Sequence, residues 1–303
     1  MRVSRQIELA FAERNIAFER DIPLSRMTSY GIGGPADLLA MPDTPEKTAF
    51  ALRILAENSV QVFAIGKGTN LLVADSGFCG AIIQIGNKEI TPLEQGRWEV
   101  GALAGLDSVV ECTIAEGLAD AVGLAGIPGS IGGGLAMNAG AWGYTVGSLA
   151  ASICAFDLEG EELAVDVASA FEYRCFALRG KAAIFSAVIS LEKRADPVEC
   201  AKRVDDIRRK RAESQPLRMR SAGCVFKNPE GDHAGRLIDE AGLKGLSVGG
   251  ASVSDIHANF IVTREGATAS DVLSLVEMIR ERVRAAFAVE LELEVMKLGF
   301  GKE

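Results

Sequence analysis

Glycine is the feature of this sequence that most restricts its fold. Nine of the 33 glycines fall between residues 123 and 147. This density is too high for an ordinary packed helix, because glycine lowers helix stability. It instead lets the backbone lie close to a ligand, and we expect a binding segment here and not a packed helix. A purely structural role stays open, since glycine also permits two backbones to pack closely.

A second glycine-rich segment, AIGKGTNLLV at residues 64–73, ends an apolar stretch that predicts a buried strand. Two glycines at a strand end can point backbone N–H groups at an anion, and Thr69 and Asn70 add side-chain donors, which suits a diphosphate. The segment matches neither a P-loop nor a G-x-G-x-x-G fingerprint. An ordinary glycine turn is the alternative. Two such segments in one chain favour a dinucleotide ligand.

Composition limits the class of protein further. The 303 residues are 48% hydrophobic and 24% charged, which predicts more than one core, since single cores rarely grow past ~250 residues. The net charge of −9 and the pI near 5.0 argue against nucleic acid or an anionic membrane as a partner. Neither a signal peptide nor a long apolar run is found, so we expect a cytoplasmic protein. Six scattered cysteines and two histidines predict neither disulfides nor a metal site.

Local patterns predict the helices and strands. Thr44-Pro45 and Asp196-Pro197 are strong helix starts, and a new domain is expected to begin with the second of them. Apolar residues alternate with Glu290, Glu292 and Glu294, which predicts a strand with an exposed acidic face. The expected helices cover residues 4–18, 44–58 and 196–213 and a last helix capped by Ser270. The expected strands include residues 36–41, 60–65, 71–74, 81–85, 97–101, 151–157, 184–191 and 289–295, and a short apolar strand within 221–229 that is entered through Gly223 and left through Asn228-Pro229.

A few residues outside the glycine segments could carry chemistry. Arg174 could bind an anion, although an isolated arginine is more often a solvated surface residue. Cys224 could be reactive, although such a cysteine is more often a small buried apolar group. The basic run at 208–211 could attract a diphosphate or form a solvated helix face. His233 and His257 offer no evident base or metal cluster.

An ordered set of short segments runs along most of the chain. The segments are TSYGIGGPAD at 28–37, GKGTN at 66–70, AGIPGS to MNAG at 125–140, Tyr173-Arg174, Gln215-Pro216, SAGCVFKNP at 221–229, AGLKG at 241–245, SDIHANF at 254–260 and LELEV at 291–295. Each segment alone is a weak signal, but this many in order is specific. Together they resemble the UDP-N-acetylenolpyruvoylglucosamine reductase family over roughly residues 27–299. The spacing between Tyr173 and Cys224, without a long insertion, is similar to the shorter form of that family.

The resemblance implies an α+β fold. Residues 1–80 and 81–194 would form a two-subdomain FAD-binding fold of the vanillyl-alcohol oxidase type, and residues 195–303 an α+β substrate-binding domain. Both histidines lie beyond residue 230, so FAD is expected to be non-covalent unless Cys79 or Cys112 captures it. The implied FAD contacts are Gly66, Lys67, Gly68, Thr69, Asn70, Leu71, Gly126, Pro128, Gly129, Ser130, Gly132, Asn138, Ala139 and Gly140.

The resemblance also implies a reaction in peptidoglycan precursor synthesis. NADPH would reduce FAD, and flavin N5 would deliver hydride to C3 of UDP-N-acetylglucosamine enolpyruvate, giving UDP-N-acetylmuramate after protonation at C2. Arg174 and Glu294 would stabilise the enolate, because developing negative charge requires a positioned donor. Tyr173, Lys227 and Asn228 would bind the substrate. An oligomer is not required.

Cys224 stands where the family commonly has a serine that donates the proton. A thiol of ordinary pKa ~8.5 is mainly protonated at neutral pH and is a stronger acid than an alcohol, so we expect it to serve as the donor. Its cost would be sensitivity to oxidation. Glu294 would need a pKa raised by burial, which the exposed-face pattern does not predict. The alternatives are an alcohol or hydroxy-acid oxidase on the same fold and a non-catalytic nucleotide-sugar-binding module.

Overall fold

The computed structural model describes residues 4–301, which form two compact, interleaved units. Unit 1 contains the chain up to Ile22, Asp37–Lys67 and Cys79–Arg209. Unit 2 contains Pro23–Ala36, Gly68–Phe78 and the chain from Lys210 onward. Each unit has its own hydrophobic core. The three expected domains, by contrast, follow one another along the chain with boundaries at residues 80 and 194, and that division stays a prediction.

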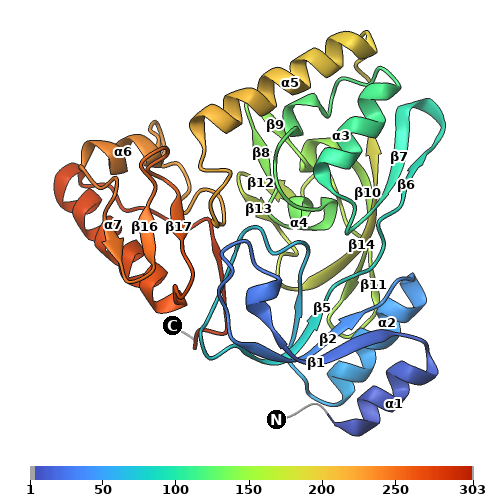
Figure 1. The fold of residues 1–303 in the computed structure, drawn as a ribbon. Coiled ribbons are helices and arrows are strands. Elements are labelled where there is room, and N and C mark those ends of the chain that lie inside the picture. Colours follow the sequence, from blue (N-terminus) through green and yellow to red (C-terminus); the bar gives the residue numbers. More distant parts are fainter. Residues whose placement is uncertain (1–3, 302–303) are drawn as a thin grey trace. The chain divides into compact units, whose positions relative to one another are not determined.

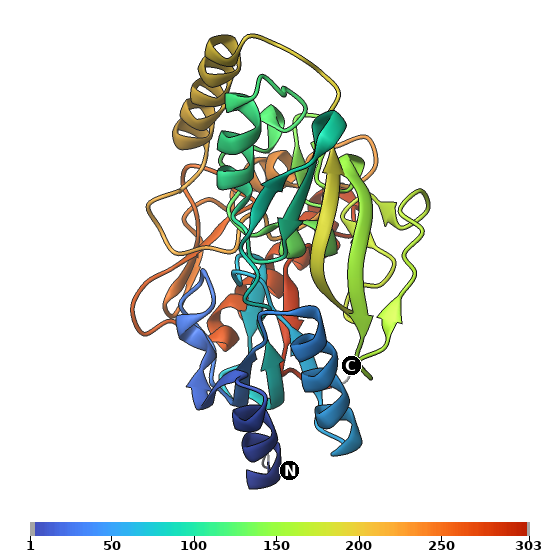
Figure 2. The same cartoon turned by 90° about the vertical axis from the view of Figure 1, so that its right-hand side faces the viewer.

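The larger sheet of unit 1 is antiparallel, with five strands in the order β11-β10-β14-β7-β6 (Figure 2). Its strands are β6 (Ile90–Pro92), β7 (Arg97–Gly101), β10 (Ala150–Asp157), β11 (Glu162–Leu163) and β14 (Ala182–Ser190). A four-stranded sheet, mostly within unit 1, has the order β1-β2-β5-β3, with β3 and β5 parallel. Its strands are β1 (Ala17–Pro23), β2 (Pro35–Met41), β3 (Val62–Ala64) and β5 (Phe78–Ile83).

Helices and two small hairpins complete unit 1 (Figure 1). The predicted helix starts are confirmed: Thr44 accepts a hydrogen bond from the Lys47 N–H at 3.2 Å, and Asp196 Oδ1 accepts one from the Val198 N–H at 2.8 Å. The helices are α1 (Arg5–Glu13), α2 (Pro45–Glu57), α3 (Leu106–Ala115), α4 (Ile131–Ala136) and α5 (Pro197–Ser214), whose last residues belong to unit 2. The hairpins pair β8 (Gly140–Ala141) with β9 (Tyr144–Thr145) and β12 (Phe171–Glu172) with β13 (Cys175–Phe176).

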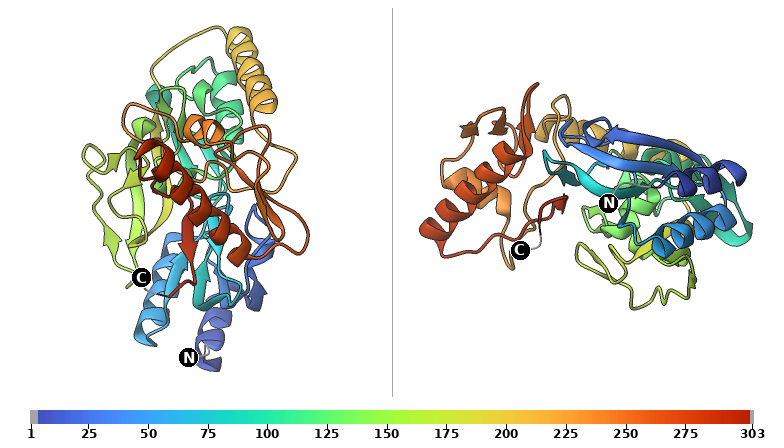
Figure 3. Two further views of the ribbon diagram at one scale, coloured as in Figure 1. Left: turned by 90° about the vertical axis from the view of Figure 1, so that its left-hand side faces the viewer. Right: turned by 90° about the horizontal axis from the view of Figure 1, so that it is seen from below.

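In unit 2, a long helix packs against a small antiparallel sheet (Figure 3). The helix α7 (Ala269–Phe287) contacts α6 (Ala234–Glu240) and the strands β15 (Ser247–Val248) and β16 (Ala251–Val253), beside β17 (Ile261–Thr263). A separate parallel pair joins β4 (Leu71–Val73) to β18 (Met296–Leu298). None of the helices in residues 4–301 is both long and apolar enough to span a membrane.

The structure corrects two predicted helix ends. Thr268, not Ser270, caps α7, because its side chain accepts the Asp271 N–H while the Asp271 carboxylate accepts the Thr268 N–H. The first helix stops at Glu13 rather than near residue 18, since Asn15 has a left-handed φ of 51°. The last two residues of the range expected to be helical already belong to β1.

The expectation of no packed helix in the glycine-rich segment is wrong for residues 131–136, which form α4. Ser130 caps this helix by accepting the Gly133 N–H at 3.4 Å. Gly132 permits close packing, because a Cβ there would lie 2.9 Å from the Ala102 Cβ. The structural reading that stayed open for these glycines thus holds for part of the segment.

Two predicted strands are not regular strands. Residues 221–229 and 289–295 make only isolated bridges, Cys224 with Phe260 and Phe226 with Leu293. The regular strand near the end of the chain is β18, directly after the second of these segments. Alternation in residues 289–295 identified the buried Leu291 and Val295, but pairing depends on partners far away in the chain.

Candidate active site

Cys224 lies in a segment of unit 2 that is held from both sides. On one side the Val225 N–H donates to the Asn259 carbonyl at 2.8 Å. On the other, the Glu294 N–H donates to the Val225 carbonyl at 2.8 Å. Cys224 and Glu294, which are far apart in sequence, are therefore on adjoining stretches of backbone.

Asn259 is a structural residue of this site that the sequence reasoning missed. Its side chain is buried, and its amide accepts the Phe226 N–H at 3.0 Å and donates to the Phe226 carbonyl at 2.8 Å. The amide therefore replaces a strand neighbour for the residue two positions after Cys224. Its signal was present in SDIHANF at 254–260, where a single asparagine lies between apolar residues.

The predicted exposure of Glu294 is wrong. Leu291 and Val295 are buried and Glu292 is exposed, as the alternation predicts, but Glu294 is half-buried. Asn70 contributes to this arrangement, since its Nδ2 donates to the Glu294 carbonyl at 3.0 Å. An amide predicted to bind a cofactor is thus engaged with the backbone of Glu294.

Lys227 and Asn228, the expected substrate contacts in unit 2, also bond within the protein. The Lys227 ammonium forms an ion pair with Glu292. Asn228 Oδ1 accepts the Ala234 N–H at 3.1 Å and so caps the start of α6. These bonds fix the loop that follows Cys224. A role in substrate binding stays a prediction.

Arg174 lies in unit 1, at the turn between β12 and β13, with a left-handed φ of 55°. Its Nη2 donates to the Gly140 carbonyl at 2.8 Å and its Nη1 to the Asn138 carbonyl at 3.4 Å. Its guanidinium carbon lies 5.3 Å from the centre of the Tyr173 ring, and that side chain is 57% exposed. The hairpin thus presents a cation beside an exposed aromatic ring.

The two glycine-rich segments meet in unit 1. A Cβ at Gly66 would lie 2.6 Å from Ser130 Oγ, and a Cβ at Gly105 would lie 2.8 Å from Lys67 Nζ. Gly126 and Gly129, before α4, have positive φ values of 71° and 135°. Pro128 lies between these two glycines, and Ala139 follows α4. The other predicted cofactor contacts of the first segment, Gly68, Thr69, Asn70 and Leu71, belong to unit 2.

This meeting of segments fits FAD. Little side-chain bulk separates the two backbones, and a lysine and a serine supply polar atoms beside them, as an anionic diphosphate requires. Other glycines in these segments are required by local packing and not by a ligand. A Cβ at Gly140 would lie 2.1 Å from the Tyr144 carbonyl oxygen, so that glycine serves the β8–β9 hairpin.

Asp107, at the start of α3, links the second glycine segment to α5, and sequence reasoning missed it. Its Oδ1 accepts the Gly126 N–H at 2.8 Å and an Arg208 Nη2 hydrogen bond at 3.1 Å. Arg208 also bonds Glu111 at 2.8 Å, and this hydrogen bond raises the pKa of the Arg208 guanidinium. One arginine of the basic run is therefore used within unit 1.

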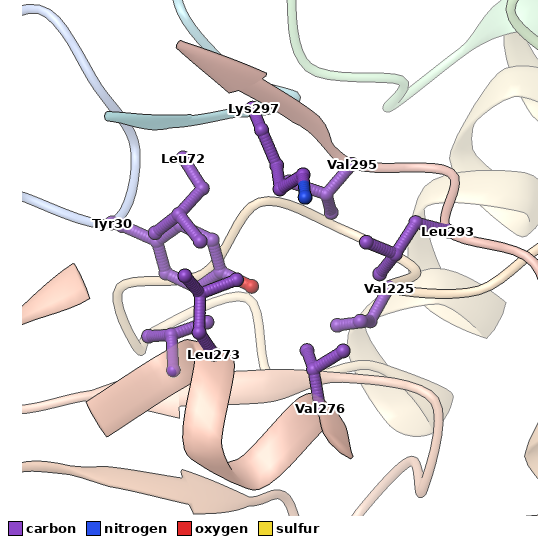
Figure 4. Close-up of a pocket in the computed structure, with 9 residues that line it drawn as sticks. Tyr30, Leu72, Val225, Leu273, Val276, Leu293, Val295 and Lys297 are labelled. Atoms are coloured by element: carbon purple, nitrogen blue, oxygen red, sulfur yellow. The ribbon is translucent and has the colours of Figure 1, made fainter. Parts of the chain in front are cut away.

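A small hollow in unit 2 is lined by apolar side chains together with Tyr30 and Lys297 (Figure 4). The Tyr30 side chain is buried, and burial raises the pKa of its hydroxyl well above the ordinary value. Because the lining is mostly apolar, the hollow lacks the cluster of donors that a sugar nucleotide would need. We assign it to the packing of unit 2. The other lining residues are Leu72, Val225, Val272, Leu273, Val276, Leu293 and Val295.

Comparison with known proteins is consistent with this geometry. Residues 36–158 match the family model described as an FAD binding domain. Residues 215–298 match the model for the C-terminal domain of UDP-N-acetylenolpyruvoylglucosamine reductase. With the mixed helices and strands of both units, these matches define an FAD-dependent oxidoreductase.

Individual relatives specify the family. The reductase of this name from Geobacter sulfurreducens is 40% identical over 92% of this chain and 93% of its own length. That from Carboxydothermus hydrogenoformans is 41% identical over 91% of this chain and 92% of its own. The chain belongs to the UDP-N-acetylenolpyruvoylglucosamine reductase family. The crystal structure of the Thermus caldophilus reductase superposes with a TM-score of 0.79 at 35% identity, covering 93% of this chain and 99% of the other.

This membership confirms the resemblance and the α+β fold class, and supports the expected use of FAD and NADPH. The activity is that of an FAD-dependent reductase of peptidoglycan precursor synthesis. The individual site residues stay predictions.

Proposed function

We propose that this enzyme uses NADPH to reduce UDP-N-acetylglucosamine enolpyruvate to UDP-N-acetylmuramate in the cytoplasm. Arg174 and Glu294 would stabilise the enolate, and Cys224 would protonate C2. Tyr173, Lys227 and Asn228 would contact the substrate. The name of the relatives and the chemistry of these side chains support the proposal.

The hydrogen bond from the Glu294 N–H to the Val225 carbonyl is the observation that carries the proposal. It places a carboxyl-bearing residue beside the residue that follows Cys224. A reduction of an enol ether needs a proton donor and a group that stabilises the carboxylate of the enolate. Unit 2 supplies both residue types on adjoining backbones.

The role of each residue follows from the proton or positive charge that it can supply, and Glu294 would have to be protonated to donate a hydrogen bond. When bound, FAD would supply the hydride that is needed at C3 of the substrate. Negative charge then develops on the substrate carboxylate, where the Arg174 guanidinium and the Glu294 carboxyl would form hydrogen bonds that strengthen as charge develops. The Cys224 thiol transfers its proton to C2 and regains one from solvent. The carbon–carbon double bond thereby gains one hydride and one proton, and NADPH becomes NADP⁺.

The residues that would hold FAD in unit 1 are Gly66, Lys67, Gly126, Gly129 and Ser130. Backbone N–H groups at Gly66, Lys67 and Gly129, the Lys67 ammonium and the Ser130 hydroxyl suit the diphosphate, whereas the Gly126 N–H already donates to Asp107. Asp107 would keep the Gly126 backbone in place through the hydrogen bond described above.

An anaerobic half-reaction experiment tests the function. Purified protein with FAD is reduced by NADPH until its visible flavin absorption is bleached, and the enolpyruvyl sugar nucleotide is then added without oxygen. We expect the absorption to return and the product to carry two added hydrogens by mass spectrometry. No return of absorption would overturn the proposal. Return with oxygen alone would support an oxidase, and failure to bind any flavin would support a binding module.

A further inference from the structure

Asn138 combines burial with an uncommon backbone conformation. It is 7% exposed and has a φ of 40°. Asparagine tolerates this left-handed region better than most residues with a side chain, because its amide can form local hydrogen bonds. A buried amide must also have partners, since an unpaired one costs ~1–3 kcal/mol.

Both ends of the Asn138 amide bond within unit 1. Nδ2 donates to the Glu172 carbonyl at 2.7 Å, and Oδ1 accepts the Gly147 N–H at 3.1 Å. Glu172 lies two residues before Arg174, at the end of β12. The amide therefore fixes the backbone from which the turn carrying Arg174 begins.

The Arg174 side chain in turn bonds to the backbone at and after Asn138. The Arg174 Nη1 donates to the Asn138 carbonyl, and its Nη2 donates to the carbonyl of Gly140. Arg179 adds a hydrogen bond from Nη1 to the Arg174 carbonyl at 3.1 Å. The guanidinium and the turn are thus both anchored to residues 138–140.

We propose that Asn138 is a positioning residue for Arg174, acting in the reduction of the sugar nucleotide and not in the binding of FAD. This inference rests on the proposed function of Arg174. It differs from the sequence-based expectation that Asn138 contacts the cofactor. Its physical basis is that displacement of a charge-stabilising group by about 1 Å can cost ~10²-fold in rate.

Two substitutions separate the amide from the backbone conformation. Asn138→Asp keeps an acceptor for Gly147 but replaces the donor to the Glu172 carbonyl with an oxygen. Asn138→Gly permits the left-handed backbone and removes the amide. Asn58→Asp is the matched control, because Asn58 Nδ2 donates to the Ile54 carbonyl at 2.8 Å at the end of α2.

Three quantities are measured on each variant: the dissociation constant of FAD, the rate of flavin reduction by NADPH, and the rate of reoxidation by the enolpyruvyl sugar nucleotide. For both Asn138 variants we expect reoxidation to slow by roughly 10- to 100-fold, with the other two quantities within about 3-fold of wild type. Asn58→Asp should change none of them.

A double-mutant cycle tests whether Asn138 acts through Arg174. Asn138→Asp added to Arg174→Ala should slow reoxidation by no more than about 2-fold beyond Arg174→Ala alone. Full additivity would overturn the inference, as would a loss of FAD affinity parallel to the loss of reoxidation. Normal reoxidation in the Asn138 variants would overturn this inference but not the proposed function. Absence of reoxidation in the wild type would overturn both.

Discussion

Position 224 carries a thiol where the resemblance implies a serine, and thiols are stronger acids than alcohols. Cys224 is half-buried and follows Gly223, whose φ is 79°. We predict that Cys224→Ala slows reoxidation by the sugar nucleotide by ~10²- to 10⁴-fold, as for loss of a general acid. Flavin reduction by NADPH should stay near normal. Stopped-flow absorption measures both steps.

Two further variants complete that test. Cys224→Ser should retain much of the activity, because the hydroxyl also has a transferable proton. Cys112→Ala, which removes an exposed thiol on α3, should have no effect. If both substitutions at position 224 were silent, Cys224 would not be the acid.

His257 gives a prediction about pH. Its Nδ1 accepts the Asn259 N–H at 3.2 Å and its ring packs against Phe260. Burial, and secondly the charge of Lys244, lower the pKa of His257. The unfolded chain therefore takes up a proton first as pH falls below ~6.5, and the free energy of unfolding decreases until the lower folded-state pKa is passed.

Denaturant unfolding between pH 5 and 8 measures this effect. We expect His257→Asn to flatten the pH dependence below ~6.5 while the wild type loses stability there. His233→Asn is the control, since His233 precedes α6 and takes part in neither of the His257 contacts described above. Equal slopes for wild type and His257→Asn would contradict the prediction.

Among the elements, α3 and α5 are joined through Asp107, which also bonds the Gly126 N–H. We predict that Asp107→Ala weakens FAD binding by roughly 10-fold, the value of one hydrogen bond to a charged acceptor. Asp107→Asn should have a smaller effect, because its amide oxygen can still accept from Gly126. Fluorescence titration of FAD measures the dissociation constant.

The control for Asp107 is Glu111→Gln. It removes the other carboxylate that bonds Arg208 without touching Gly126. Exposed ion pairs contribute ~0–1 kcal/mol, so FAD affinity should be nearly unchanged. An equal loss of FAD affinity in Asp107→Ala and Glu111→Gln would contradict the prediction. It would show that the ion pairs with α5, and not the hydrogen bond to Gly126, control the affinity for FAD.

Elements with local signals could be predicted from the sequence. The starts of α2 and α5 depend on caps and prolines within four residues, and both predictions are confirmed. The segments around Cys224 and Glu294 could not be assigned correctly, because they are held by single bridges and by the Asn259 amide. Alternation shows which side of a segment is apolar, but it does not show whether a neighbour forms a ladder.

The sequence also predicted only part of the arrangement of the candidate site. The resemblance predicted Arg174, Cys224 and Glu294, and the structure shows that the backbone stretches of the last two adjoin within unit 2. The sequence could not show that the amides of Asn70 and Asn138 bond to protein backbone. An asparagine in a loop has the same local sequence pattern whether it faces a ligand or a carbonyl.

At the scale of the whole molecule, the separate cores of the two units allow FAD binding to be followed in one of them. Both tryptophans, Trp98 and Trp142, belong to unit 1. We predict that FAD at 100 times its dissociation constant stabilises the transition detected by tryptophan fluorescence by ~2.7 kcal/mol. Thermal unfolding over a range of FAD concentrations measures this. Riboflavin, which lacks the diphosphate, should have a much smaller effect, and an equal effect would argue against a diphosphate site at the glycine segments.

The pairing of β4 with β18 has a consequence for synthesis of the chain. β4 is made of buried apolar residues, Leu71 to Val73, and its partner begins only at Met296. A ribosome adding ~5–20 residues per second leaves this strand without its partner for on the order of tens of seconds. The nascent chain thus carries an uncovered hydrophobic edge for most of its translation. Until Met296–Leu298 is made, such an unpaired strand can pair with another chain, which is a route to aggregation.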